Sequence, residues 1–212
     1  GLFSVSRLQV IRLQCLFWPE LHCSLKHKRI REYTTIWMDS LRNGETQLVN
    51  TNKLIRYYDG ATGLKTGTTS KAGYCVSATA ERDGMELVTV VLGSDNSSER
   101  FEDAKKMLNW GFANYSIYKP KIDKALITDV SVLYGVQEII NPKVGTVSPI
   151  LIKKGTEDQI IQNVELCSDV EAPIEKNQTL GTIWFELDGE KIGECRIFNE
   201  NRVERRSVMY IF

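Results

Sequence analysis

A lysine, two threonines and a glycine stand together at Lys65, Thr66, Gly67 and Thr68, in a glycine-punctuated stretch over residues 59–73. Lys65 offers a fixed positive charge, and the threonines offer hydroxyl groups. Gly67 removes a side chain, so that a ligand backbone can lie against the edge of a strand that begins here. The combination predicts a site for a peptide carboxylate or carbonyl. Because Lys-Thr-Gly by itself is most often a solvated strand entry, this prediction depends on the longer context.

Other arrangements of reactive residues are weaker. Residues 63–66 do not form a phosphate-binding loop, because a leucine separates the glycine from the lysine and the upstream glycine is missing. His22, Cys23 and His27 lack the partner pair of a zinc site and are interpreted as surface and core residues. The five cysteines are an odd number without a Cys-x-x-Cys pair, so they specify no disulfide framework. We therefore predict no metal and no cofactor.

The net charge of zero argues against partners that bind through long-range electrostatic attraction. The 212 residues carry 27 basic and 27 acidic side chains, which argues against a nucleic-acid-binding protein. Residues 1–32 are basic, with six basic and two acidic groups, but such a segment is usually a solvated face. The apolar opening over residues 1–18 is interrupted by two arginines and lacks a cleavage site, so we expect neither an export signal nor a membrane span here.

The elements around the Lys-Thr-Gly stretch are predicted from periodicity. Residues 26–43 favour a helix that is closed by Asn43-Gly44 and has one apolar face, made of Ile30, Tyr33, Trp37 and Leu41. Residues 73–80 and 85–92 are typical of two strands joined by a turn at Asp83-Gly84. This hairpin would extend the sheet that begins with the Lys-Thr-Gly strand.

A second helix is expected after the hairpin. Ser97 or Ser98 can cap it, and its acidic first turns suit the helix dipole. Its apolar residues recur at three- and four-residue steps and face the sheet: Phe101, Ala104, Leu108, Phe112 and Tyr115. We expect this helix to end at Lys119-Pro120-Lys121, where a linker begins.

The pattern then changes to short β-rich runs every eight to twelve residues, which predicts a separate all-β module, a small sandwich. The runs are 125–133, 136–140, 150–153, 160–166, 182–187 and 191–198. Asp188-Gly189 predicts a tight hairpin turn between the last two runs.

The longer context of Lys-Thr-Gly resembles the D-alanyl-D-alanine carboxypeptidases, the low-molecular-weight penicillin-binding proteins. The resemblance runs from about residue 27 to residue 212. The matching features are Asn50 and Asn52, Leu54-Ile55, Gly63 to Thr69, Ala72-Gly73-Tyr74, Arg100, Trp110-Gly111-Phe112 and Ala172 to Gly181, with Asn177 in place of one glycine.

The resemblance implies an α+β fold class with three segments. Residues 27–118 would form the C-terminal part of a penicillin-binding, β-lactamase/transpeptidase-like domain, an antiparallel sheet with packed helices. Residues 119–212 would form an all-β sandwich domain. Residues 1–26 do not match the family.

The resemblance also implies roles for the site residues. Lys65 would be catalytic, by positioning and polarising the serine network, and Thr66 would bind the carboxylate of the terminal D-Ala. Gly67 would let the substrate approach, and the Thr68 backbone N–H would supply half of an oxyanion hole. Arg100 would be a second carboxylate partner, although an isolated arginine at a helix entry more often forms an ion pair.

Two family motifs do not precede Lys65. The family acts through Ser-x-x-Lys at a helix start and a Ser-x-Asn loop, and neither occurs upstream. The similar letters at residues 94–96 and 116–119 lie downstream in the reversed order and are interpreted as chance. We therefore expect a truncated or frame-disrupted family member with little carboxypeptidase activity. The alternative is a non-catalytic cell-wall or protein-binding module.

The expected partners also follow from the resemblance. They are a peptidoglycan stem peptide or a β-lactam, with the family located at the cell envelope outside the cytoplasm. The amphipathic C-terminal helix that tethers family members is not seen in this chain. A partial sheet would expose an edge strand, so self-association through that edge is a further expectation.

Overall fold

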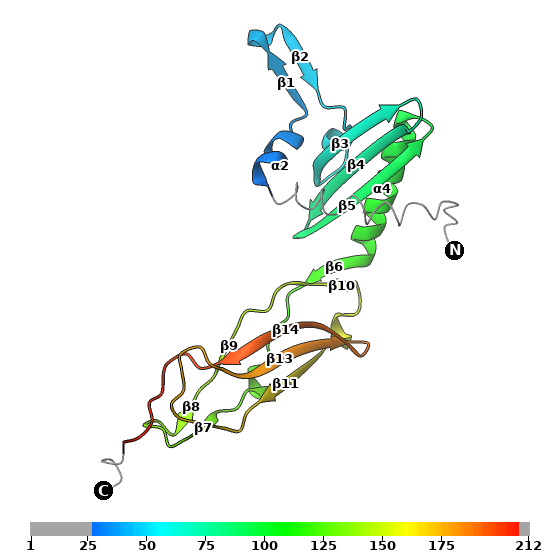
Figure 1. The fold of residues 1–212 in the computed structure, drawn as a ribbon. Coiled ribbons are helices and arrows are strands. Elements are labelled where there is room, and N and C mark those ends of the chain that lie inside the picture. Colours follow the sequence, from blue (N-terminus) through cyan, green and yellow to red (C-terminus); the bar gives the residue numbers. More distant parts are fainter. Residues whose placement is uncertain (1–26, 208–212) are drawn as a thin grey trace. The chain divides into compact units, whose positions relative to one another are not determined.

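The computed structural model describes residues 27–207, and the chain divides into two units after Asn114. In the described part, no helix has the length and apolar character needed to cross a membrane. The elements of the first unit are α2 (Lys28–Thr34), β1 (Met38–Leu41), η1 (Arg42–Gly44), β2 (Thr46–Val49), α3 (Leu54–Tyr57), β3 (Ala61–Thr69), β4 (Gly73–Arg82), β5 (Met85–Ser94) and α4 (Ser97–Asn114) (Figure 1).

The centre of the first unit is an antiparallel sheet in the order β3-β4-β5. The predicted hairpin is confirmed: Arg82 pairs with Met85, and Asp83 and Gly84 both have positive φ angles, of 51° and 76°. Positive φ at both central residues is the signature of the turn whose twist matches a hairpin, and Asp-Gly supplies it at low cost. The Lys-Thr-Gly residues therefore lie on β3, a terminal strand of this sheet.

Helix α4 covers one face of this sheet (Figure 1). Its apolar face is confirmed at Phe101, Ala104 and Leu108, each at most 4% exposed. Leu87 of β5 packs closely against Gly111. A Cβ atom added to Gly111 would lie 2.5 Å from the Leu87 Cδ1 atom. Because Leu87 pairs with Ala80 across the sheet, the buried alanine side of β4 is the side that faces α4.

Two details of α4 differ from expectation. Its cap is Asn96 rather than Ser97 or Ser98, since the Asn96 side-chain oxygen accepts from the N–H groups of residues 98 and 99. The helix also ends at Asn114 instead of continuing to residue 119. Tyr115–Tyr118 forms strand β6, because the chain there pairs with β10 (Ile150–Lys153) of the second unit.

The prediction of one helix over residues 26–43 was wrong. The helix ends at Thr34, whose hydroxyl donates to the Thr62 carbonyl of β3 at 2.8 Å. The Thr35 hydroxyl turns back to donate to the Arg31 carbonyl at 2.9 Å, which competes with further helix formation. Met38–Leu41 instead pairs with Thr46–Val49 as a two-stranded hairpin. Every residue of both strands is exposed, so no buried face imposed the two-residue alternation that marks a strand.

The second unit consists of short strands, as predicted. Besides β6 and β10, its strands are β7 (Val130–Leu133), β8 (Ile139–Ile140), β9 (Lys143–Val144), β11 (Ile161–Leu166), β12 (Asp169–Glu171), β13 (Thr179–Leu187) and β14 (Glu190–Phe198), with short 3-10 turns at Lys124–Leu126 (η2) and Glu157–Gln159 (η3). A four-stranded sheet has the order β11-β13-β14-β9, and a three-stranded sheet has the order β12-β7-β8.

Two apolar clusters hold this unit together. One is centred on Ile183, Phe185 and Ile197 of the four-stranded sheet, and the other on Val130 and Ile174 beside the three-stranded sheet. The predicted turn at Asp188-Gly189 is confirmed by positive φ at both residues. The α+β class, with a helix-covered sheet followed by an all-β domain, is therefore confirmed.

The burial of α4 generates a first prediction. Leu108 is completely buried, so Leu108→Ala should remove its contacts, leave a cavity and lower the free energy of unfolding by about 3 kcal/mol. Lys106→Ala on the exposed side of the same helix is the matched control, and a loss below about 1 kcal/mol is expected there. Urea titrations monitored by circular dichroism measure both, and equal losses would contradict the packing described here.

Candidate active site

Within residues 27–207, the sheet order makes β3 an edge strand, with β4 as its one neighbouring strand. Its register pairs Lys65 with Ser77, Thr66 with Val76, and Thr68 with Tyr74. Val76 lies on the side of β4 that faces α4, and side chains alternate along a strand. Thr66 and Thr68 therefore share the α4 side, whereas Lys65 and Gly67 belong to the opposite face.

Lys65 and Thr66 contact each other through the backbone. The Lys65 Nζ atom donates to the Thr66 carbonyl at 2.7 Å, and Lys65 is exposed. Thr66 is only 8% exposed, and its hydroxyl lies 2.6 Å from the hydroxyl of Thr51. The strand thus presents an accessible cation next to a hydroxyl that is already held in a hydrogen bond.

Gly67 leaves the strand open at this point. A Cβ atom added there would meet nothing within 4 Å, and Thr68, the next residue, is exposed. Open space beside an edge strand lets another extended backbone approach it closely. The sequence argument for this glycine thus agrees with the room that the fold leaves around it.

Arg100 joins the far end of β3 to helix α4. It is only 6% exposed, and its Nη1 atom donates to the Gly67 carbonyl (3.2 Å), the Thr68 hydroxyl (3.3 Å) and the Cys75 carbonyl (3.2 Å). Its Nη2 atom donates to Ser97 Oγ at 3.1 Å. The structure therefore brings Arg100, Gly67 and Thr68 together, with Lys65 on the other face of the strand.

This geometry gives Arg100 a structural role that the sequence did not indicate. Burying a guanidinium is costly unless its donors find acceptors. Here the two Nη atoms donate to oxygens of β3, β4 and Ser97, whereas the buried Nε atom has no hydrogen-bond partner in the described part of the chain. The ring of Phe101 lies 4.8 Å from its central carbon, and that of Tyr74 lies 5.4 Å away. Its role as a carboxylate partner remains a prediction.

The sequence reasoning missed how residues 50–52 support β3. Asn52 is 1% exposed, and its Nδ2 atom donates to the Gly63 carbonyl at 2.9 Å. The Asn50 side chain donates to the carbonyls of Thr34 and Ile36. The available signals were the family resemblance at Asn50 and Asn52 and the turn chemistry of Asn-Thr-Asn, and neither indicates the partner strand.

Residues 94–96 and 116–119, which have the letters of the two family motifs, have structural roles. Asn96 of the Ser94–Asn96 letters caps α4, and Ser94 ends β5. Ser116 lies in strand β6, so the lysine three residues later is not one helical turn from it. Ser116 and Lys119 therefore lack the arrangement of a serine nucleophile with a lysine base.

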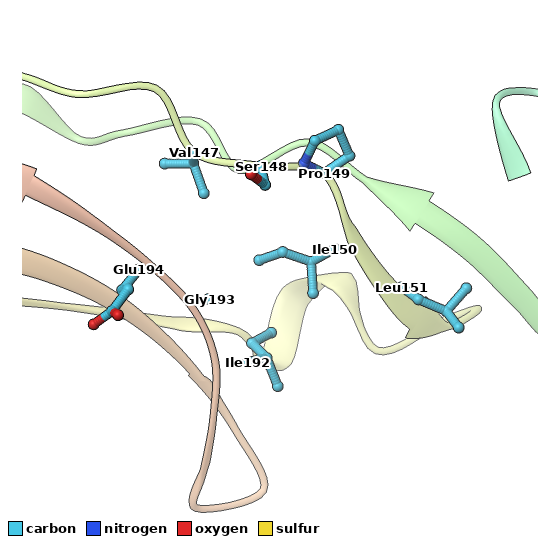
Figure 2. A pocket seen from close by; sticks show the side chains of 8 residues that line it. All are labelled: Val147, Ser148, Pro149, Ile150, Leu151, Ile192, Gly193 and Glu194. Atoms are coloured by element: carbon cyan, nitrogen blue, oxygen red, sulfur yellow. The ribbon is translucent and has the colours of Figure 1, made fainter. Parts of the chain in front are cut away.

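The second unit contains an open cavity of about 370 Å³ with a largely aliphatic lining (Figure 2). Ile150, Leu151 and Ile192 contribute apolar side chains, and the polar groups are Ser148 and Glu194, whose carboxylate is ion-paired with Lys191. Its lining holds no lysine or histidine that could act as a base for Ser148, so the Lys-Thr-Gly strand is the better candidate for acyl chemistry.

Metal-binding geometry is not found within residues 27–207, where no group of three His, Cys, Asp or Glu side chains could hold an ion. Cys75, Cys167 and Cys195 are free thiols, and burial raises the pKa of Cys167 and Cys195 above the usual value. His22 and Cys23, considered above as zinc ligands, lie outside the described residues.

Comparison with known proteins covers both units. Residues 20–96 match the D-alanyl-D-alanine carboxypeptidase family, and residues 115–205 match the C-terminal domain of penicillin-binding protein 5. The chain is 34% identical to D-alanyl-D-alanine carboxypeptidase DacF of Bacillus subtilis over 177 residues, which are 82% of this chain and 46% of that protein.

The chain belongs to the D-alanyl-D-alanine carboxypeptidase family.

Two further family members agree. DacC of Escherichia coli is 32% identical over 67% of this chain and 36% of its own length. The crystal structure of penicillin-binding protein 5 from Haemophilus influenzae superposes with a TM-score of 0.63 at 29% identity, over 82% of this chain and 51% of that one. The chain thus spans about half the length of these family members, or less.

The contacts of Arg100 generate a second prediction. Arg100→Met should leave the Gly67 and Cys75 carbonyls without the donor that they share and destabilise the chain by about 2 kcal/mol. Arg100→Lys should recover little of this, because one ammonium cannot replace a planar fork.

Amide hydrogen exchange measures the local effect of both variants. Residues 66–69 should exchange about tenfold faster, with a much smaller change at the Asp83-Gly84 turn. Lys106→Met, on the exposed side of α4, is the control. Normal protection of residues 66–69 in Arg100→Met would show that the arginine does not hold the strand.

Proposed function

We propose that residues 27–114 form the substrate-clamping side of a D-alanyl-D-alanine carboxypeptidase active site. The observation that carries this proposal is the edge strand β3, where an exposed cation, a hydrogen-bonded hydroxyl and an open glycine follow one another at residues 65–67. These groups match the chemistry of a peptide that ends in a carboxylate. Family membership makes the D-Ala-D-Ala terminus of a peptidoglycan stem peptide the substrate of choice.

Each residue of the clamp has one task in this proposal. The Thr66 hydroxyl donates to the terminal carboxylate, and the Lys65 charge favours the anion and polarises the reacting groups. Gly67 admits the substrate backbone to the strand edge. The Thr68 N–H donates to the oxygen of the scissile carbonyl as negative charge develops on it. A β-lactam would occupy the same site through its own carboxylate and carbonyl.

In the complete reaction, a serine oxygen attacks the carbonyl of the penultimate D-Ala while a lysine takes the serine proton. The bond to the terminal D-Ala breaks, an acyl-enzyme forms, and water releases it. The Ser-x-x-Lys motif that supplies these groups does not precede Lys65 in the 212 residues. Since nucleophile and base act as a unit, their absence would cost about 10⁶ in rate, so these residues alone should hydrolyse little or no substrate.

The location follows from the substrate. A peptidoglycan stem peptide with its terminal D-Ala still attached is met at the outer side of the cytoplasmic membrane, so we place the protein's action at the cell envelope. The competing function is a non-catalytic cell-wall-binding module. The open aliphatic cavity of the second unit is the observation that favours it.

Binding of a short substrate tests the clamp. Nα-acetyl-D-Ala-D-Ala should shift the backbone amide NMR signals of residues 65–69, because its carboxylate binds there. The same dipeptide with a C-terminal amide in place of the carboxylate lacks the negative charge and should bind about tenfold more weakly. Lys65→Ala should weaken binding of the acid by a similar factor. Lys71→Ala, in the exposed turn after β3, is the control and should have little effect.

Labelling with a fluorescent penicillin separates the two functions. The 212-residue chain should bind the dipeptide and form no covalent adduct. A covalent adduct on any serine would overturn the proposed loss of hydrolysis. If the dipeptide leaves residues 65–69 unchanged while muropeptides shift signals of the second unit, the binding-module function is correct.

A further inference from the structure

The hydroxyl groups of Thr51 and Thr66 form a pair whose chemistry goes beyond the clamp described above. They are 2.6 Å apart, which is a short and well-formed hydrogen bond between hydroxyls. The two residues are 15 positions apart in the sequence, so the contact depends on the tertiary fold. Thr51 is exposed, whereas Thr66 is 8% exposed.

The loop that carries Thr51 is fixed on both sides. Asn50 donates from its side chain to the carbonyls of Thr34 and Ile36, at 3.2 and 3.0 Å. The Asn52 backbone N–H donates to Asn50 Oδ1 at 2.9 Å, and the Asn52 side chain donates to the Gly63 carbonyl. Thr51 therefore lies in a short segment anchored to α2 and to the start of β3, and its hydroxyl is presented to Thr66 by a rigid support.

Counting hydrogens defines what this pair can offer. Each threonine hydroxyl has one hydrogen to donate and can accept twice. One of the two hydrogens is used between Thr51 and Thr66, so the pair has one hydrogen left for a ligand. If Thr51 donates, that hydrogen is on Thr66, the residue between Lys65 and the open glycine in the sequence. If Thr66 donates, its hydrogen is directed away from the ligand side.

We propose that Thr51 is a positioning residue that donates to Thr66 and thereby leaves the Thr66 hydrogen for the carboxylate of the substrate. This inference rests on the proposed function of the Lys-Thr-Gly strand. A carboxylate bound at Thr66 favours this direction, because the Thr66 hydrogen then donates to negative charge. The Lys65 Nζ atom, 2.7 Å from the Thr66 carbonyl, supplies a positive charge near the same residue.

The arrangement also strengthens the clamp. A hydroxyl that accepts a hydrogen bond becomes a better donor, since successive hydrogen bonds polarise one another. Thr51 therefore acts on the ligand through Thr66 without touching it. Loss of the Thr51 hydroxyl should impair carboxylate binding more than it impairs binding of an uncharged analogue.

The test compares Thr51→Val, Thr51→Ser and Thr46→Val. Thr51→Val keeps the shape and removes the hydroxyl, and it should weaken binding of Nα-acetyl-D-Ala-D-Ala about fivefold, with a smaller change for the C-terminal amide. Thr51→Ser restores the hydroxyl and should restore binding. Thr46→Val removes an exposed threonine hydroxyl from strand β2 and is the matched control, expected to bind normally.

A ligand-free measurement keeps this inference separate from the proposed function. Three-bond NMR couplings report the χ1 rotamer of Thr66, which should be single in the wild-type and Thr51→Ser chains and averaged in Thr51→Val. If the wild-type chain binds no dipeptide, the proposed function is wrong, and a single rotamer in Thr51→Val then rejects the positioning role as well. If the wild-type chain binds and Thr51→Val binds equally well, the positioning role alone is overturned.

Discussion

The edge position of strand β3 is the constraint on which the first unit depends. An edge strand has a neighbouring strand on one side only, so half of its backbone groups need partners from elsewhere or remain available to a ligand. Here Asn52 supplies a donor to the Gly63 carbonyl near the start of the strand, and Arg100 supplies donors near its end. Between these anchors, residues 64–66 are held by β4 and by Thr51, and Lys65 stays exposed.

The two anchors, Asn52 and Arg100, differ in the free energy that their burial costs and in how they constrain the strand. Asn52 is neutral and buried, so its two hydrogen bonds within the protein replace most of the hydrogen bonds to water that it loses on folding. Arg100 is charged, and the cost of its burial is reduced by three oxygens that accept from Nη1, one that accepts from Nη2, and two aromatic rings near the guanidinium carbon. A cation buried in this way fixes one geometry of the β3–β4 pair, since any slip of the register would separate it from its acceptors.

The sequence predicts the local parts of this structure and misses those set by tertiary contacts. The Asp83-Gly84 hairpin and the apolar face of α4 follow from turn chemistry and from helical periodicity, which act over a few residues. Met38–Leu41 was misread as helix because an exposed two-stranded hairpin leaves no alternating pattern, and apolar residues happened to recur at helical steps. The Asn96 cap was missed because the adjacent serines offer the same chemistry, and only the backbone geometry chooses between them.

The site was predictable in type but not in geometry. Lys65, Thr66 and Gly67 were found from their chemistry and from family resemblance, whereas the Thr51 contact joins segments whose distance the sequence does not encode. Alternation along β3 adds a further restriction. Thr66 and Thr68 share one face of the sheet and Lys65 and Gly67 share the other, so under the proposed function a ligand that contacts both sets lies along the strand edge. Under that proposal, the clamp becomes a catalytic site only when another element supplies the serine at this edge.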